Sequence, residues 1–174
     1  PLAGDIEAST AMAQDLLRLR YSTPLFRLGS AEAIDAKVTF PGSGTDARPG
    51  VIAMRVDDTV GTDADPALDG LLVVFNATAE PITQTVPELA GKNLVLSPVQ
   101  AEGADEVVRT TTWAADAATV TVTVPARTVA VLHVLPGTPG GGTDPGDEEE
   151  VDPTAPPNVF LTDSFAATGE IEFA

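Results

Sequence analysis

Acidic side chains crowd the segment "DDTVGTDADPALD" at 57–69, where the residue types come nearest to those of a metal site. Asp63, Asp65 and Asp69 carry the hard oxygen ligands that Ca²⁺ prefers. The segment lacks the glycine and the terminal glutamate of an EF-hand loop. We therefore interpret it as a charged surface loop with solvated carboxylates. Calcium is kept only as the weaker alternative, and no metal ligand is assigned.

Nucleophilic and metal chemistry is restricted by the scarcity of histidine and cysteine. His133 is the only histidine, and its neighbours in the sequence are Leu132 and Val134. A multi-histidine metal site therefore cannot form from this chain alone. The absence of cysteine excludes disulfides and thiolate metal sites. We predict that His133 is a hydrogen-bonded residue of a core or an interface.

Three further residues could contact a sugar or carry one. The sequence Asn-Ala-Thr at 76–78 matches a glycosylation acceptor, but it ends an apolar run, so Asn76 is predicted to make hydrogen bonds at a strand end. Sugar-binding modules stack rings on exposed Trp or Tyr, and this chain has one of each. Tyr21 is predicted to cap a junction behind a helix. Trp113 is the weak candidate for a sugar contact, and its other interpretation is a structural residue at the rim of a sheet.

The excess of acidic residues argues against two classes of binding partner. The chain has 26 acidic and 9 basic residues, a formal net charge of -17, so nucleic acid phosphates and anionic membranes would be repelled. No apolar run approaches the roughly 20 residues that span a bilayer. The length suits one domain with a substantial core. No signal peptide is recognised, and a chain that begins at Pro1 is expected to be cut from a longer protein.

The first third of the chain has helical patterns. Met12, Leu16 and Leu19 form one apolar stripe of a helix predicted over 5–20. Thr23 precedes a proline, and that position disfavours the helical conformation, so the helix is expected to stop there.

After a second short turn that Ser30 caps and that runs to Ile34, the hydrophobic period becomes two. Short strands separated by turn residues predict a mainly β fold, an antiparallel β-sandwich of about eight strands preceded by one or two helices. The predicted strands are Lys37–Phe40, Val51–Val56, Leu71–Asn76, Ile82–Val86, Asn93–Leu96, Glu106–Trp113, Thr119–Val124 and Thr128–Leu135.

Two of these strands are apolar on both faces. The run "TVTVTV" at 119–124 alternates, as expected of a strand with one wet side. The runs "LLVVF" at 71–75 and "TVAVLHVL" at 128–135 do not alternate. A second sheet covers only one face of such strands, so a third layer is predicted.

Composition changes again near the end of the chain. Residues 136–157 are rich in Pro, Gly and acid, and we predict a disordered linker there. Residues 158–174 are unassigned: they begin a further module or dock as an extra strand. The predicted division is thus a helical lead-in over 1–36, a β-sandwich over 37–135, the linker and the tail.

Three stretches in this order resemble the C-terminal part of bacterial pullulanase-type α-1,6-glucosidases, which are starch-debranching glycoside hydrolases of carbohydrate metabolism built on a (β/α)8 barrel. They are "LLRLRYSTPLFRLGSAEAI", "DGLLVVFNAT" and "LSPVQAEGADEVV … VPARTVAVLHV", within residues 12–135. The resemblance implies that the opening helix is the last barrel helix and that the β-domain packs on the barrel. It also implies that the doubly apolar strands are covered by the barrel.

The same resemblance implies an enzyme whose catalytic residues lie elsewhere. Glycoside hydrolysis uses two carboxylates about 5–10 Å apart, and the family's catalytic motifs belong to the barrel. No motif carrying them occurs here, so this segment alone is expected not to be an enzyme, with no catalytic residue, no organic cofactor and its parent's barrel as partner. An extracellular or cell-surface bacterial location is expected.

Two alternatives remain open from the sequence. The chain could be an autonomous starch- or α-glucan-binding module, with Trp113 in contact with the glucan. It could also be an Ig-like structural spacer of a secreted protein, which the acidic linker would suit.

Overall fold

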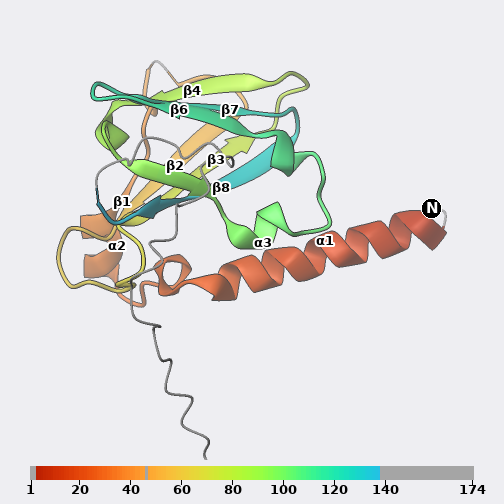
Figure 1. Ribbon diagram of the computed structural model, residues 1–174, viewed down its shortest axis with the longest axis horizontal. Coiled ribbons are helices and arrows are strands. Elements are labelled where there is room, and N and C mark those ends of the chain that lie inside the picture. Colours follow the sequence, from red (N-terminus) through yellow and green to blue (C-terminus); the bar gives the residue numbers. More distant parts are fainter. Residues whose placement is uncertain (1–2, 46, 138–174) are drawn as a thin grey trace, which may run out of the picture. The chain divides into compact units, whose positions relative to one another are not determined.

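The computed structural model describes residues 3–45 and 47–137, which include the helical lead-in and the strands (Figure 1). The predicted tail 158–174 and nearly all of the predicted linker 136–157 lie outside these described residues. The α-helices are α1 (Ala3–Ser22), α2 (Ala31–Lys37) and α3 (Pro98–Ala101), and the 3-10 helices are η1 (Pro24–Phe26), η2 (Pro87–Leu89) and η3 (Val108–Thr110). The strands are β1 (Val38–Thr39), β2 (Val51–Asp57), β3 (Gly70–Asn76), β4 (Ile82–Val86), β5 (Asn93–Leu96), β6 (Thr112–Ala115), β7 (Val120–Val124) and β8 (Thr128–Leu135).

The strands form two antiparallel sheets. One has five strands in the order β1-β2-β3-β8-β5, and the other has three in the order β4-β7-β6. β3 and β8 lie at the centre of the larger sheet, paired from Gly70 with Val134 to Asn76 with Thr128. The mainly β architecture, preceded in the sequence by helices, confirms the predicted fold class.

The main core lies between the two sheets. β7 follows the predicted alternation, since Val120, Val122 and Val124 are fully buried and the threonines between them are not. Opposite them, Leu72 and Val74 of β3 are also fully buried. The inner faces of the sheets therefore seal each other, as in other β-sandwiches.

A second core covers the outer face of the larger sheet. Leu71, Val73 and Val131 point away from the sandwich interior, yet each is at most 2% exposed. They pack with Leu19 of α1 and Leu25 of η1. The predicted third layer thus exists, but the expectation that the parent's barrel supplies it is wrong, because this chain's own helical lead-in covers the central strands.

Two caps shape that lead-in. α1 ends at Ser22, and Thr23 caps η1 by accepting a hydrogen bond from the amide of Leu25, with Pro24 in the first position, which suits its fixed φ. Ser30 accepts a hydrogen bond from the amide of Ala33 and begins α2, as predicted.

Two predicted strands need correction. The strand predicted over Glu106–Trp113 begins only at Thr112, because the carboxylate of Asp105 accepts hydrogen bonds from the amides of Val107 and Val108 and turns the chain into η3. The strand predicted over Lys37–Phe40 contains only Val38 and Thr39, since Lys37 is the last residue of α2.

The loop 57–69 is not the uniformly solvated loop that its composition predicts. Asp58 is 5% exposed, and its carboxylate accepts hydrogen bonds from the amides of Ala64 and Asp65 and from Lys37 Nζ at 2.7 Å. Lys37 is itself 3% exposed and also donates to the carbonyl of Val60. Burial acts to raise the pKa of Asp58, but the hydrogen bonds from Lys37, Asp65 and Ala64 outweigh it and lower the pKa.

We expect Lys37→Met to lower the free energy of unfolding by about 3–5 kcal/mol, because a buried carboxylate would lose its counter-charge. Urea denaturation of the 174-residue chain at pH 7 measures this. Because the pKa of Asp58 is lowered, the stabilisation is present above the ordinary value of about 3.9 and is lost as the pH falls through the lower folded value.

The matched control is Glu106→Gln, which removes an exposed pair with Arg109 at 4.0 Å and should change stability by less than about 1 kcal/mol. If Lys37→Met were as stable as the unaltered chain at pH 7, this account of the loop would be contradicted.

Candidate functional site

The most unusual surface of the described chain consists of exposed apolar side chains of α1. Large apolar side chains there are 42–64% exposed, and we call this set the α1 apolar face: Ile6, Met12, Leu16, Leu17 and Tyr21. Met12 and Leu16 lie on the same side of the helix as Leu19, which is buried against the sheet, and Ile6, Leu17 and Tyr21 lie on the opposite side. A helix that is apolar on two sides normally lies between two bodies, and only one of them is present.

Polar contacts hold α1 in a defined orientation. The carboxylate of Asp15 accepts a hydrogen bond at 2.6 Å from the amide of Ala104, which follows α3. Gly103 permits this approach, because a Cβ there would lie 2.8 Å from Asp15 Oδ2 and 2.6 Å from the carbonyl oxygen of Val99. The same carboxylate pairs with Arg18. The direction in which Leu16 and Leu17 project is therefore fixed by the fold.

The side chain of Gln100 in α3 makes the backbone hydrogen bonds with β8 that a neighbouring strand would otherwise make. β5 ends at Leu96, which pairs with Leu132 of β8. The earlier residues Val129 and Val131 of β8 therefore have no paired strand on that side. Gln100 fills the gap: its Nε2 donates to the carbonyl of Val129 and its Oε1 accepts from the amide of Val131, both at 2.8 Å. Buried backbone groups are satisfied in this way.

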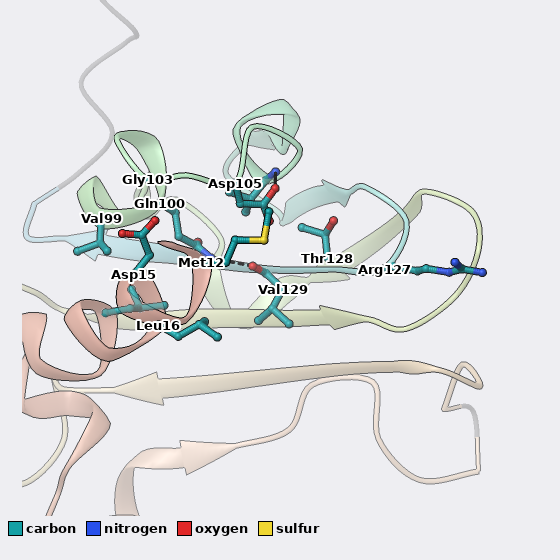
Figure 2. A pocket seen from close by; sticks show the side chains of 12 residues that line it. Met12, Asp15, Leu16, Val99, Gln100, Gly103, Asp105, Arg127, Thr128 and Val129 are labelled. Carbon is teal, nitrogen blue, oxygen red and sulfur yellow. Dashed lines mark hydrogen bonds between the residues drawn. The ribbon is translucent and has the colours of Figure 1, made fainter. Parts of the chain in front are cut away.

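A groove of about 220 Å³ opens between α1, α3 and β8 (Figure 2). Met12 and Leu16 form its helical wall, and Val129 forms its floor. Figure 2 shows Leu16 directed toward Val129, while Asp15 turns toward Gly103. The carboxylates at the groove already accept hydrogen bonds from backbone amides, so the free surface inside it is mostly apolar.

Beyond the groove, the outer face of the larger sheet ends in an uncovered row. Ile52, Phe75 and Val129 are cross-strand neighbours on β2, β3 and β8. Ile52 is 55% and Phe75 38% exposed, although Val73 and Val131 in the next row of the same face are buried. We call these three residues the sheet-end row. Since Val129 also lines the groove beside Met12 and Leu16, these two residues of α1 and the sheet-end row form one continuous apolar surface.

Two of the three acidic residues considered for calcium have other partners. Asp65 accepts a hydrogen bond from Thr23 at 2.5 Å, and Asp69 pairs with Lys92 at 2.8 Å. Within the described ranges, no three acidic or histidine side chains gather into a metal-binding group. No described helix has the length and hydropathy needed to cross a bilayer.

The two aromatic candidates lie far apart in the fold. Trp113 is 36% exposed on β6, an edge strand, where it pairs with Val122 and so sits on the inward-facing side at the rim. Tyr21 is 64% exposed near the end of α1, with the guanidinium of Arg27 4.9 Å from its ring centre. They do not form one stacking platform.

Asn76 behaves as predicted. It is 2% exposed, and its amide nitrogen donates to the carbonyls of Glu80, Val124 and Pro125. Its oxygen accepts from the amide and hydroxyl of Thr78. The side chain therefore joins the end of β3 to the connection between β7 and β8.

His133 is 9% exposed on β8, with Leu71 as its cross-strand neighbour. Its Nε2 is buried and has no hydrogen-bond partner, so the predicted core placement is right while that nitrogen makes no hydrogen bond. Burial lowers the pKa of His133, and the charge of Asp65 acts in the opposite direction.

Sequence patterns did not reveal the side chains that fix this surface. Gln100 reaches backbone groups 29 and 31 residues away, and Asp15 reaches an amide 89 residues away. Neither contact leaves a local signal. The only clue was the double apolar pattern of the central strands, which predicted a third layer without saying what supplies it.

Comparisons with known proteins cover the helices and the sandwich together. The family model described as "Alpha-1,6-glucosidases, pullulanase-type, C-terminal" matches residues 1–134. A pullulanase of Klebsiella pneumoniae is 39% identical over 140 residues, which are 79% of this chain and 12% of that protein. Pullulanase 1, chloroplastic, of Arabidopsis thaliana is 38% identical over 137 residues, 76% of this chain and 14% of that protein.

The crystal structure of PulA from Klebsiella oxytoca is similar in fold, with a TM-score of 0.68 and 39% identity. The match covers 79% of this chain and 13% of that one. The chain thus spans about an eighth of the length of these relatives, and the matched region includes the α1 apolar face.

We expect the free energy of unfolding to fall between pH 7 and pH 5 in part because of His133. Its folded pKa lies below its ordinary value of about 6.5, so the stabilisation is present above that value and is lost as the pH falls through the folded pKa. Urea denaturation at several pH values measures the slope. It should be shallower in His133→Leu, and identical slopes in the two proteins would contradict the assignment, since the chain has no other histidine.

Proposed function

Because the chain belongs to the family of C-terminal regions of pullulanase-type α-1,6-glucosidases, we propose that it is the non-catalytic β-sandwich of a debranching enzyme. The parent would hydrolyse α-1,6-glucosidic linkages in pullulan, starch or glycogen. In this proposal the segment stabilises the catalytic barrel by packing against it, and α1 is the element that joins the two.

The α1 apolar face is the observation that carries the proposal. Burying a large apolar side chain stabilises the folded state by about 1.5–3 kcal/mol. Five such side chains exposed on one helix therefore leave a large hydrophobic contribution to the folding free energy unused. The sandwich cannot bury Ile6, Leu17 and Tyr21, because Leu19 and Asp15 hold the other side of the helix against it. A body outside this chain would cover the face, and the relatives are several times longer.

The described carboxylates support a non-catalytic role. Glycoside hydrolysis commonly needs a carboxylic acid whose pKa is raised by an apolar setting and a second carboxylate nearby. Asp58, which is buried, is paired with Lys37 and has a lowered pKa, the opposite of what a general acid requires. The pKa is likewise lowered at Glu32, Asp57 and Asp116.

The rival function is that of an autonomous α-glucan-binding module, and its candidate is Trp113. A single half-exposed tryptophan at a sheet rim gives a small stacking surface, and Tyr21 lies elsewhere and is occupied by Arg27. Retardation of the chain by soluble α-glucan in a native gel, abolished by Trp113→Ala, would favour the rival over the docking role.

We expect the isolated 174-residue chain to self-associate through the α1 apolar face, and Ile6→Gln combined with Leu17→Gln to make it monomeric. Analytical ultracentrifugation over a concentration series measures this. Both side chains are more than half exposed, so the double substitution should change the free energy of unfolding by less than about 1 kcal/mol. Glu7→Gln, at an exposed polar position of the same helix, is the control.

In the full-length enzyme, the same double substitution should shorten the half-life of heat inactivation several-fold, because the contact between α1 and the barrel is weakened. A chain that is monomeric without any substitution, together with a full-length enzyme whose inactivation rate is unchanged by the substitutions, would overturn the proposal.

A further inference from the structure

Arg127 has the most unusual backbone conformation of the described chain. Its φ is +52°, and among the described residues it is the one non-glycine residue with positive φ. A side chain with a Cβ is strained in this left-handed region, which glycine and asparagine tolerate better. A strained residue that the sequence retains points to a role for its side chain.

The surrounding structure imposes this conformation. The amide of Arg127 donates to the carbonyl of Thr78 at 3.0 Å. Just before it, the carbonyls of Val124 and Pro125 accept hydrogen bonds from the amide of Asn76. These contacts use only backbone groups of the turn, so they do not require an arginine side chain, and an asparagine would suit the turn better.

The guanidinium of Arg127 has no partner in the part of the chain that the structure describes. Five other basic residues form ion pairs, namely Arg18, Lys37, Arg55, Lys92 and Arg109. Arg127 makes none with the described residues, and neither do Arg20, Arg27 and Arg48, although the chain has a net charge of -17 and carboxylates are plentiful. Figure 2 shows its side chain extended away from the groove and from the other labelled residues.

The position of this free cation is informative. Arg127 lies two residues before Val129, which belongs both to the sheet-end row and to the groove beside Leu16. The guanidinium therefore projects from the end of the continuous apolar surface described above. Interfaces commonly surround an apolar centre with charged groups that select the partner and fix its orientation.

We propose that Arg127 binds a carboxylate on the part of the full-length enzyme that covers the sheet-end row. The partner segment would place an aspartate or glutamate beside apolar side chains, so that the apolar part covers Phe75 and Ile52 while the carboxylate meets the guanidinium. Arginine suits this task because its planar fork can hold a carboxylate by two hydrogen bonds. This inference rests on the proposed docking function and adds a second contact to that of α1.

The experiment places Arg127→Asn and Arg127→Lys both in the 174-residue chain and in the full-length enzyme. In the chain alone, Arg127→Asn should leave the melting temperature unchanged or raise it, because asparagine tolerates the left-handed conformation. In the full-length enzyme, Arg127→Asn should accelerate heat inactivation several-fold, and Arg127→Lys less. The difference should shrink in 1 M NaCl if the new contact is a solvent-accessible ion pair. Arg109→Gln, which removes another exposed cation, is the control and should not accelerate inactivation.

Two results would overturn the inference. Equal loss of stability in the chain and in the full-length enzyme would show that Arg127 supports its own domain, and an unchanged inactivation rate in the full-length enzyme would show that it has no partner there. The α1 substitutions separate this failure from that of the docking function: if they accelerate inactivation and Arg127→Asn does not, only the role of Arg127 is wrong.

Discussion

The structure depends on the fact that its two central strands are apolar on both faces. β3 and β8 present Leu72 and Leu132 to one side and Leu71 and Val131 to the other, and all four are buried. A two-sheet sandwich buries only the first set. The end of α1 and η1 must bury the second, so the helical lead-in is part of the domain's core and not an appendage. The need to bury this outer face explains why helices precede the strands in this mainly β domain.

The same requirement gives α1 two sides with different roles. The side with Leu19 completes the core, and the contact between Asp15 and Ala104 fixes the rotation of the helix. The side with Ile6 and Leu17 is then held in solvent, where it gains nothing from this chain. A helix shared between two bodies couples their stabilities, because neither can lose the helix without exposing apolar surface. That coupling is the physical content of the proposed stabilising role in a debranching enzyme.

Polar groups in this domain fix geometry where apolar packing alone would leave it open. Gln100 continues the hydrogen bonding of β8 beyond β5, and Asn76 joins two connections at the far end of β3. Lys37 and Asp58 hold the loop that follows β2. Each side chain satisfies buried backbone or charged groups that would otherwise be costly. Arg127 differs from them, because its backbone is held while its charge remains free.

The sequence by itself determined the mainly β class, most of the strands and the end of the first helix before Pro24. It also determined the burial of His133 and the hydrogen-bonding role of Asn76. These features follow from hydrophobic periodicity, from proline and from residues at strand ends, all of which act locally. The sequence also showed that the central strands need a third layer. Only the tertiary structure decided that Leu19 and Leu25 supply that layer and that Asp58 is buried against Lys37. It also decided that the side chains of Leu17 and Phe75 remain exposed to solvent. Those outcomes depend on contacts between residues far apart in the chain, and one sequence carries no local record of which apolar surfaces find each other.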